Sequence, residues 1–291
     1  MDVDVLVSNF TNGGNSTGNR NIYCLAAPVG PLVWSVFCVP CVCVGLPASV
    51  GLLWVLIQRQ RSGFSSDTYM LNLTAMDLIY NSSIPLAILN SFLLRNPYVL
   101  QATIIANSFN NMGRPLFTVC ICADCYVAVL HPITYMKMKL SSYRLAACVV
   151  VWVVSIAYGT AFGSNTQLLF SPFLVIPFVV SLLPIVFLDV SILCALRKPD
   201  PAGRRGVHPQ KQKAMRTIAY SLAMAVTAYL PPLVVFGSSA LLPQSPQELF
   251  CRIAVPSTIP TMMASSIMPL FSLKNLGCLN DAMKRCCDRS V

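Results

Sequence analysis

Long apolar stretches alternate with short polar segments along the chain. A stretch of roughly 20 apolar residues crosses the hydrocarbon core of a bilayer as an α-helix. Because an unpaired backbone amide is too costly in lipid, only helices and closed barrels span membranes, and long unbroken runs predict helices. The runs of this length are residues 32–57, 69–94, 99–130, 145–162, 173–196, 217–242 and 250–273. The pattern predicts an all-α, integral membrane bundle of seven transmembrane helices.

Polar segments at the two ends divide the chain further. The predicted regions are an N-terminal segment at 1–30, the seven-helix domain at 31–274 and a tail at 275–291. In the tail, apolar residues recur at i, i+3 and i+7 from Leu276, with basic residues opposite. This spacing is typical of a short amphipathic helix on the membrane surface. Cys286 and Cys287, which follow it, are either S-palmitoylated or free thiols.

Composition and charge narrow the class of protein. Hydrophobic residues make up 55% of the chain and charged residues only 10%, whereas a soluble domain has roughly 25% charged residues. The net charge of +10 would favour nucleic acid if it formed one soluble patch, but most Lys and Arg lie after the first, third and fifth spans and in the tail. The positive-inside rule places those segments in the cytoplasm. We expect a multi-pass protein of the plasma membrane with an extracellular N-terminus and no nucleic-acid partner.

The connection between the fifth and sixth spans is the longest basic segment. It covers residues 197–216 and is rich in Pro and Gly as well as in Lys and Arg. Such a composition favours a solvated segment that contacts membrane lipid headgroups or a protein partner.

The predicted outer side carries candidate sites for covalent modification. Asn9 and Asn15 each begin an N-x-Ser/Thr sequence and are expected to be glycosylated. Cys24 and Cys251 are the two cysteines on this side; one precedes the first span and the other opens the seventh. Since those spans are neighbours in a ring of seven helices, we expect a disulfide between them in an oxidising compartment.

One landmark residue or motif in nearly every span extends the interpretation. In chain order they are Asp77, Asp124-Cys125-Tyr126 followed by His131-Pro132, Trp152, Pro184, Pro231 and Pro269. As an ordered set they resemble the rhodopsin-like G-protein-coupled receptors. Gly45-Leu46-Pro47 in the first span is most similar to the chemokine, purinergic and peptide branch. The resemblance implies a receptor for an extracellular or lipid-borne ligand, with a heterotrimeric G protein or arrestin as cytosolic partner.

Several positions depart from the family. Cys125 stands where the family has an arginine that engages the G protein and, at rest, pairs with the aspartate before it. Asp124 is therefore expected to lose its local cation, while Asp124, Cys125 and Tyr126 remain the candidate transducer interface. The seventh-span motif reads Met-Pro-Leu-Phe-Ser at 268–272, and Tyr229 aligns with the usual tryptophan of the sixth span. These departures leave open an atypical or decoy receptor that binds ligand without G-protein coupling.

Charged residues inside the spans need a partner or a function, because each costs on the order of 2.5–3.5 kcal/mol at the centre of a helix in the membrane. In the family, the aspartate aligned with Asp77 helps hold a sodium ion together with a small polar residue of the third span. That second position is Arg114 here. We therefore expect the guanidinium to replace the ion and to form a buried, hydrogen-bonded pair with Asp77. Asp189 has no predicted partner.

Two asparagines on the third span are candidates for ligand contact. Asn107 and Asn111 precede Arg114 at helical spacing and share its face. The resemblance aligns them with ligand-contacting positions, together with Tyr229 and Thr258. The alternative is that these amides join helices through hydrogen bonds without a ligand. The absence of a carboxylate on the outer part of this face argues against a cationic amine as ligand.

Other classes of function have less support. The chain has 2 histidines, both near the predicted inner surface, and no metal-ligand spacing or nucleophile constellation, so we expect neither an enzyme nor a cofactor or metal site. A small-solute transporter could use Asp77 and Arg114 as a relay. Transporters usually show internal repeats and interrupted helices, and the sequence shows neither. The sequence does not specify the ligand.

Overall fold

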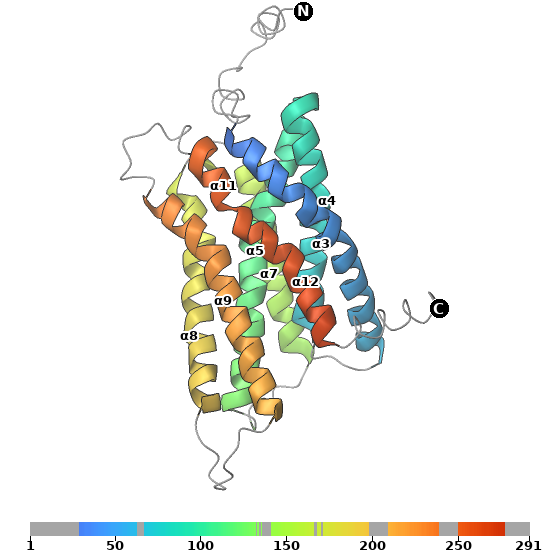
Figure 1. Cartoon of the computed structure of the whole chain (residues 1–291), viewed down its shortest axis with the longest axis vertical. Helices are drawn as coiled ribbons and strands as arrows, with labels where there is room; N and C mark the ends of the chain where they lie inside the picture. Colours follow the sequence, from blue (N-terminus) through green and yellow to red (C-terminus); the bar gives the residue numbers. More distant parts are fainter. Residues whose placement is uncertain are drawn as a thin grey trace, which may run out of the picture.

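The computed structural model describes residues 29–62, 67–131, 133, 135, 141–165, 168–169, 171–197, 209–238 and 250–276. Within these ranges the chain is helical and contains no strand. The helical segments are α3 (Val29–Arg61), α4 (Thr68–Leu89) with η2 (Asn90–Leu94), α5 (Pro97–Leu130), α7 (Ser141–Ser164), η4 (Pro172–Val175) with α8 (Ile176–Arg197), α9 (Pro209–Ser238), and η6 (Phe250–Ala254) with α11 (Val255–Ser257) and α12 (Ile259–Asn275). They follow the seven predicted spans in order, and the predicted all-α membrane bundle is confirmed (Figure 1).

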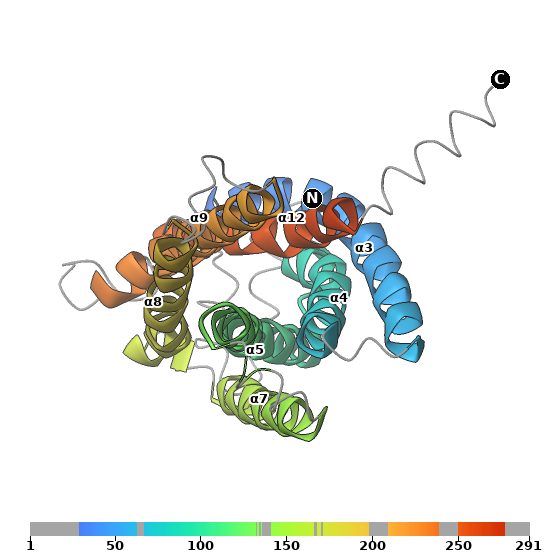
Figure 2. The ribbon, with the colours of Figure 1, turned by 90° about the horizontal axis from the view of Figure 1, so that it is seen from below.

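Six of these segments are long and apolar enough to cross a membrane by composition alone. The helix that falls short is α4, whose apolar run is interrupted by Asn72, Asp77 and Asn81. It nevertheless packs between α3 and α5, and both Asp77 and Asn81 are buried (Figure 2). Asp77 and Asn81 therefore face the inside of the bundle.

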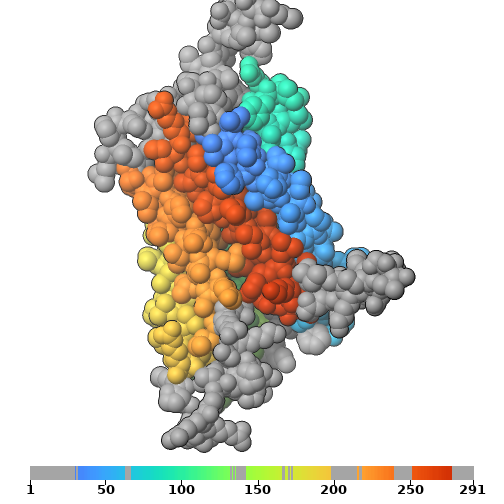
Figure 3. Space-filling view, in the orientation of Figure 1, coloured from blue at the N-terminus to red at the C-terminus, as the bar shows by residue number. Residues whose placement is uncertain are grey.

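Helix α5 occupies the middle of the bundle. It packs against α4, α7 and α8, whereas α7 lies outside the ring and packs mainly on α5 (Figure 2). On the opposite face α12 lies between α3 and α9 (Figure 3). Because α5 has neighbours on several sides, residues around much of its circumference are buried.

Small residues set the close approach of α5 and α7. A side chain on Gly113 of α5 would overlap Met76 of α4 and Ser155 of α7. A Cβ on Gly159 of α7 would lie 3.0 Å from the Ile105 carbonyl oxygen. Helices in membranes associate through such small-residue contacts, because lipid offers no hydrophobic driving force between them.

A polar contact links α7 to α4. The indole Nε1 of Trp152, the predicted fourth-span landmark, donates to Asn72 Oδ1 at 2.9 Å. The same indole packs near Phe109 and Phe117 of α5, with ring centres 5.3 Å and 6.3 Å away. One side chain therefore connects α4, α5 and α7.

Several expectations concern residues outside the described ranges. These are the glycosylation sites Asn9 and Asn15, the cysteines Cys286 and Cys287, and nearly all of the surface helix at 275–291. Cys251 is buried and disulfide-bonded. Its expected partner, Cys24, lies outside the described ranges, so the pairing stays a prediction.

Candidate functional site

A buried ion pair lies in the middle of the bundle. Nη1 of Arg114 on α5 donates to Oδ1 of Asp77 on α4, and their side chains are 3% and 2% exposed. This is the contact that the sequence led us to expect. A charge pair removed from water this completely is held by its geometry, and losing either partner would leave a lone buried charge. The pair therefore ties α4 to α5 at mid-membrane depth.

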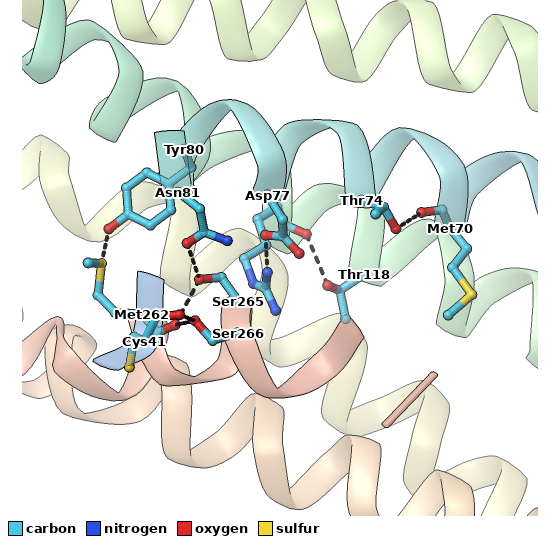
Figure 4. A network of polar contacts seen from close by, with 11 residues as sticks. Cys41, Met70, Thr74, Asp77, Tyr80, Asn81, Thr118, Met262, Ser265 and Ser266 are labelled. Atoms are coloured by element: carbon cyan, nitrogen blue, oxygen red, sulfur yellow. Dashed lines mark hydrogen bonds and ion pairs between the residues drawn. The ribbon is translucent and has the colours of Figure 1, made fainter. Parts of the chain in front are cut away.

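Neighbouring groups extend the pair along α5 and toward α9. Thr118 Oγ1 donates to the Arg114 carbonyl at 2.9 Å, which keeps its hydroxyl within α5 (Figure 4). Tyr229 on α9 is 3% exposed and close enough to the guanidinium to interact with it electrostatically. Its ring packs against Phe178 of α8, with ring centres 6.2 Å apart. The residue expected to contact a ligand thus lies deep in the bundle beside the ion pair.

One helical turn from Asp77, a set of weaker polar contacts joins α4 to α12 and α3 (Figure 4). Ser265 Oγ on α12 lies 3.5 Å from Asn81 Oδ1, and Ser266 Oγ donates to the Cys41 carbonyl of α3 at 2.9 Å. The Tyr80 hydroxyl of α4 contacts the Met262 sulfur of α12. Four helices therefore meet around the ion pair through polar side chains.

A cavity of about 260 Å³ extends from Asp77 toward the ends of the helices that carry the basic residues. It lies between α3, α4, α5, α9 and α12, and most of its wall is apolar. Met268 and Ser272, two positions of the unusual seventh-span motif, form part of the wall. Asp77 is the charged residue that lines it. Asp77, the carboxylate partner of the ion pair, therefore lines a cavity between the helices.

A second ion pair lies near the C-terminal end of α5, the inner end in the predicted topology. Arg144 Nη2 on α7 is 3.0 Å from both carboxylate oxygens of Asp124, and the Tyr143 hydroxyl donates to Asp124 Oδ1 at 2.9 Å. The same Arg144 nitrogen lies 3.0 Å from the Tyr135 hydroxyl. The expectation that Asp124 loses its local cation is wrong, because α7 supplies one. No sequence pattern indicates this partner, since Arg144 stands among the basic residues of the connection before the fourth span.

The other residues of the inner end are arranged differently. Cys125 is exposed, and Tyr126 is half-buried with its ring centre 6.1 Å from that of His131. Asp189 of α8, for which no partner was predicted, is buried and interacts with the thiol of Cys122 on α5. Asp124 is thus held by α7, while its neighbour Cys125 remains accessible.

The predicted ligand residues do not gather in the cavity described above. Asn107 is exposed, Asn111 is half-buried, and the Thr258 hydroxyl donates to the Val255 carbonyl at 2.7 Å. The amide that is fully buried on α5 is Asn110, with 1% exposure. It precedes Arg114 by four residues, but the spacings of Asn107 and Asn111 are equally helical, so periodicity alone does not single out Asn110.

Comparison with known proteins agrees with this architecture. Residues 49–172 match the family model "7 transmembrane receptor (rhodopsin family)". Similar proteins include mouse G-protein coupled receptor 35 (27% identical; 65% of this chain, 66% of the relative), bovine lysophosphatidic acid receptor 5 (22%; 66% and 61%) and bovine G-protein coupled receptor 183 (24%; 58% and 47%). The matched part thus spans less than two thirds of each of these relatives. With the helical bundle and its ordered landmarks, these matches make the chain similar to the rhodopsin-like family of seven-transmembrane receptors, over residues 49–172 for the family model.

Proposed function

We propose that the chain is a cell-membrane receptor that binds an extracellular or membrane-borne ligand among the outer halves of its helices and shifts the bundle between two states. A ligand shifts such an equilibrium only through contacts that differ between the states. The candidate positions Asn107 and Asn111 carry no carboxylate, which argues against a cationic amine as the ligand.

The buried Asp77–Arg114 pair is the observation that supports this function best. It joins α4 to α5, reaches Tyr229 of α9, and contributes Asp77 to the wall of the inner cavity. Rearrangement of these helices at the outer side must therefore act on the pair and, through Asp77, on the cavity wall. A close-packed interior transmits such displacements instead of absorbing them.

The inner cavity is the proposed site of a cytosolic transducer, either a heterotrimeric G protein or arrestin. Basic residues in the last turns of α3, α8 and α12 mark this end of the bundle as cytoplasmic; they are Arg59, Arg61, Arg197 and Lys274. The N-terminus is then extracellular. The proposed transducer contacts come from the end of α5, where Cys125 is exposed.

A second candidate function is an atypical receptor that binds and internalises ligand without G-protein turnover. It is favoured by one arrangement: Cys125 offers a weak thiol donor where an arginine would offer five, and Asp124 is fully engaged by α7. The transducer would then find little charge at the end of α5.

Nucleotide exchange on a panel of purified G proteins separates the two candidates. The full chain is reconstituted in nanodiscs, and exchange is measured with the protein and with empty nanodiscs. Ligand-independent exchange above that of the empty nanodiscs supports coupling for the G protein concerned. Exchange at the level of empty nanodiscs across the panel, together with uptake of surface-labelled receptor in cells, supports the atypical receptor.

A further inference from the structure

Arg144 is held on several sides at the inner end of the bundle. Its side chain is only 3% exposed, and one nitrogen contacts both oxygens of Asp124 and the hydroxyl of Tyr135. The guanidinium carbon also lies 5.6 Å from the ring centre of Tyr135 and 6.0 Å from that of Tyr143. A planar guanidinium stacked on aromatic rings is far more fixed than a surface cation.

The place of Arg144 within α7 is unfavourable for that helix alone. It lies in the first turn of Ser141–Ser164, next to the positive end of the helix dipole. A cation there is destabilising, and an anion is preferred. The carboxylate of Asp124 compensates for this cost, so the position is explained by the partner on α5 and not by α7 itself.

This contact joins α5 to a helix that stands apart from the cavity. The helix α7 packs on α5 outside the ring, and the residues that line the cavity come from other helices (Figure 2). A movement of the other cavity-lining helices α3, α4, α9 and α12 relative to α5 therefore leaves the α5–α7 contact intact. The pair holds α5 in place and does not resist the movement of those four helices.

We infer that Arg144 is a positioning residue that supplies the counter-charge of Asp124 and fixes the inner end of α5 to α7 in both states of the bundle. The two-state part of this inference rests on the proposed function. In this chain the cation is thus relocated from the position after Asp124 to another helix. The consequence is that Cys125 stays on a fixed helix end although it makes no ion pair itself.

A double-mutant cycle on the full chain in nanodiscs tests the inference. The variants are Arg144→Gln, Asp124→Asn and the two combined, and the readout is the melting temperature. Each single change should lower it by roughly 4–8 °C, because each leaves one buried charge alone. The double variant should melt no lower than the worse single variant, because it leaves no unpaired charge.

Two further variants distinguish an ion pair from simple packing. Arg144→Lys keeps the charge and should recover at least half of the loss seen in Arg144→Gln. The matched control is Arg59→Gln, since Arg59 pairs with Asp67 at 2.8 Å at the same end but is 37% exposed. This exposed pair should contribute less than about 2 °C.

The outcomes separate this inference from the proposed function. Losses that simply add in the double variant, or no recovery with lysine, overturn the positioning role and leave the receptor proposal untouched. If both single variants fail to fold, a folded double variant supports the inference and its absence overturns it. Strong coupling without nucleotide exchange on any G protein keeps the positioning role and counts against transduction.

Discussion

Helix α5 takes part in two buried ion pairs, which lie at different depths of the bundle. In the middle of the bundle α5 provides the arginine and α4 the carboxylate, whereas at the inner end α5 provides the carboxylate and α7 the arginine. The central pair is 2–3% exposed, and the carboxylate of the inner pair is 14% exposed. Asp77 lines the cavity, but neither Asp124 nor Arg144 does.

This difference shows that burial of a charge pair does not by itself indicate a switch. A pair affects the equilibrium between two states only when its geometry differs between them. The central pair joins α4 to α5, both of which border the cavity, and can change when those helices move. The inner pair joins α5 to the peripheral α7 and contributes mainly to stability.

The largest expected effect follows from removing the central cation. Arg114→Ser leaves the Asp77 carboxylate buried without a partner, so the free energy of unfolding should fall by roughly 3–5 kcal/mol. The new serine also restores the aspartate and small polar residue that bind sodium in the family. Thermal unfolding in nanodiscs, in sodium chloride and in choline chloride, measures both effects.

Sodium should raise the melting temperature of Arg114→Ser and leave the natural chain unchanged. The control Asp77→Asn combined with Arg114→Ser should lose the response to sodium, because the carboxylate that would bind the ion is gone. Equal melting temperatures for Arg114→Ser and the natural chain in both salts would show that the central pair contributes no stability.

Only one of the two ion pairs could be predicted from the sequence. Asp77 and Arg114 stand inside long apolar runs, where a charge is conspicuous, and the family alignment brings them together. Arg144 stands just before the fourth apolar run, where a basic residue looks like part of an inner connection. In the structure α7 begins at Ser141, so Arg144 lies within the helix and reaches Asp124.

The outer site shows a different limit of sequence reasoning. Hydropathy located the helices because composition shows which segments enter lipid, and a segment in lipid must pair its backbone amides within a helix. Burial on α5 depends on which helices pack around it, and composition does not encode that. Asn107 is therefore exposed, whereas Asn110 is buried between neighbouring helices.

Lysine substitutions at the two arginines should have smaller effects on stability than removal of the charge, and they test how each guanidinium is held. At position 114 one guanidinium nitrogen contacts Asp77, and Tyr229 interacts more weakly, so Arg114→Lys keeps the main interaction and should lose on the order of 1 kcal/mol. At position 144 the guanidinium contacts Asp124 and stacks on Tyr135 and Tyr143, so Arg144→Lys should lose more than Arg114→Lys. Among the charge-removing variants we expect the larger loss of stability at position 114, whereas among the lysine variants we expect the larger loss at position 144.

Chemical unfolding of both lysine variants beside the natural chain measures this order. The charge-removing variants Arg114→Ser and Arg144→Gln serve as references in the same experiment. A larger loss of stability for Arg114→Lys than for Arg144→Lys would contradict this explanation, in which Arg114 depends mainly on one charged contact and Arg144 also on stacking and further hydrogen bonds.

The smallest expected effect concerns Cys125, where the inner pair changes what a restored arginine would do. In the family this arginine is held by the preceding aspartate at rest. Here Asp124 already binds Arg144 and the Tyr143 hydroxyl, so an arginine introduced at position 125 is not restrained by it. We expect weak or absent nucleotide exchange for the natural chain and a gain of up to about tenfold for Cys125→Arg, since a hydrogen bond made in exchange for one to water contributes only about 0.5–1.5 kcal/mol net. Cys125→Gln, which adds length and polarity without charge, is the control and should gain less. Robust exchange by the natural chain, equal to that of the arginine variant, would show that the transducer does not need this charge and that the atypical receptor is the wrong interpretation.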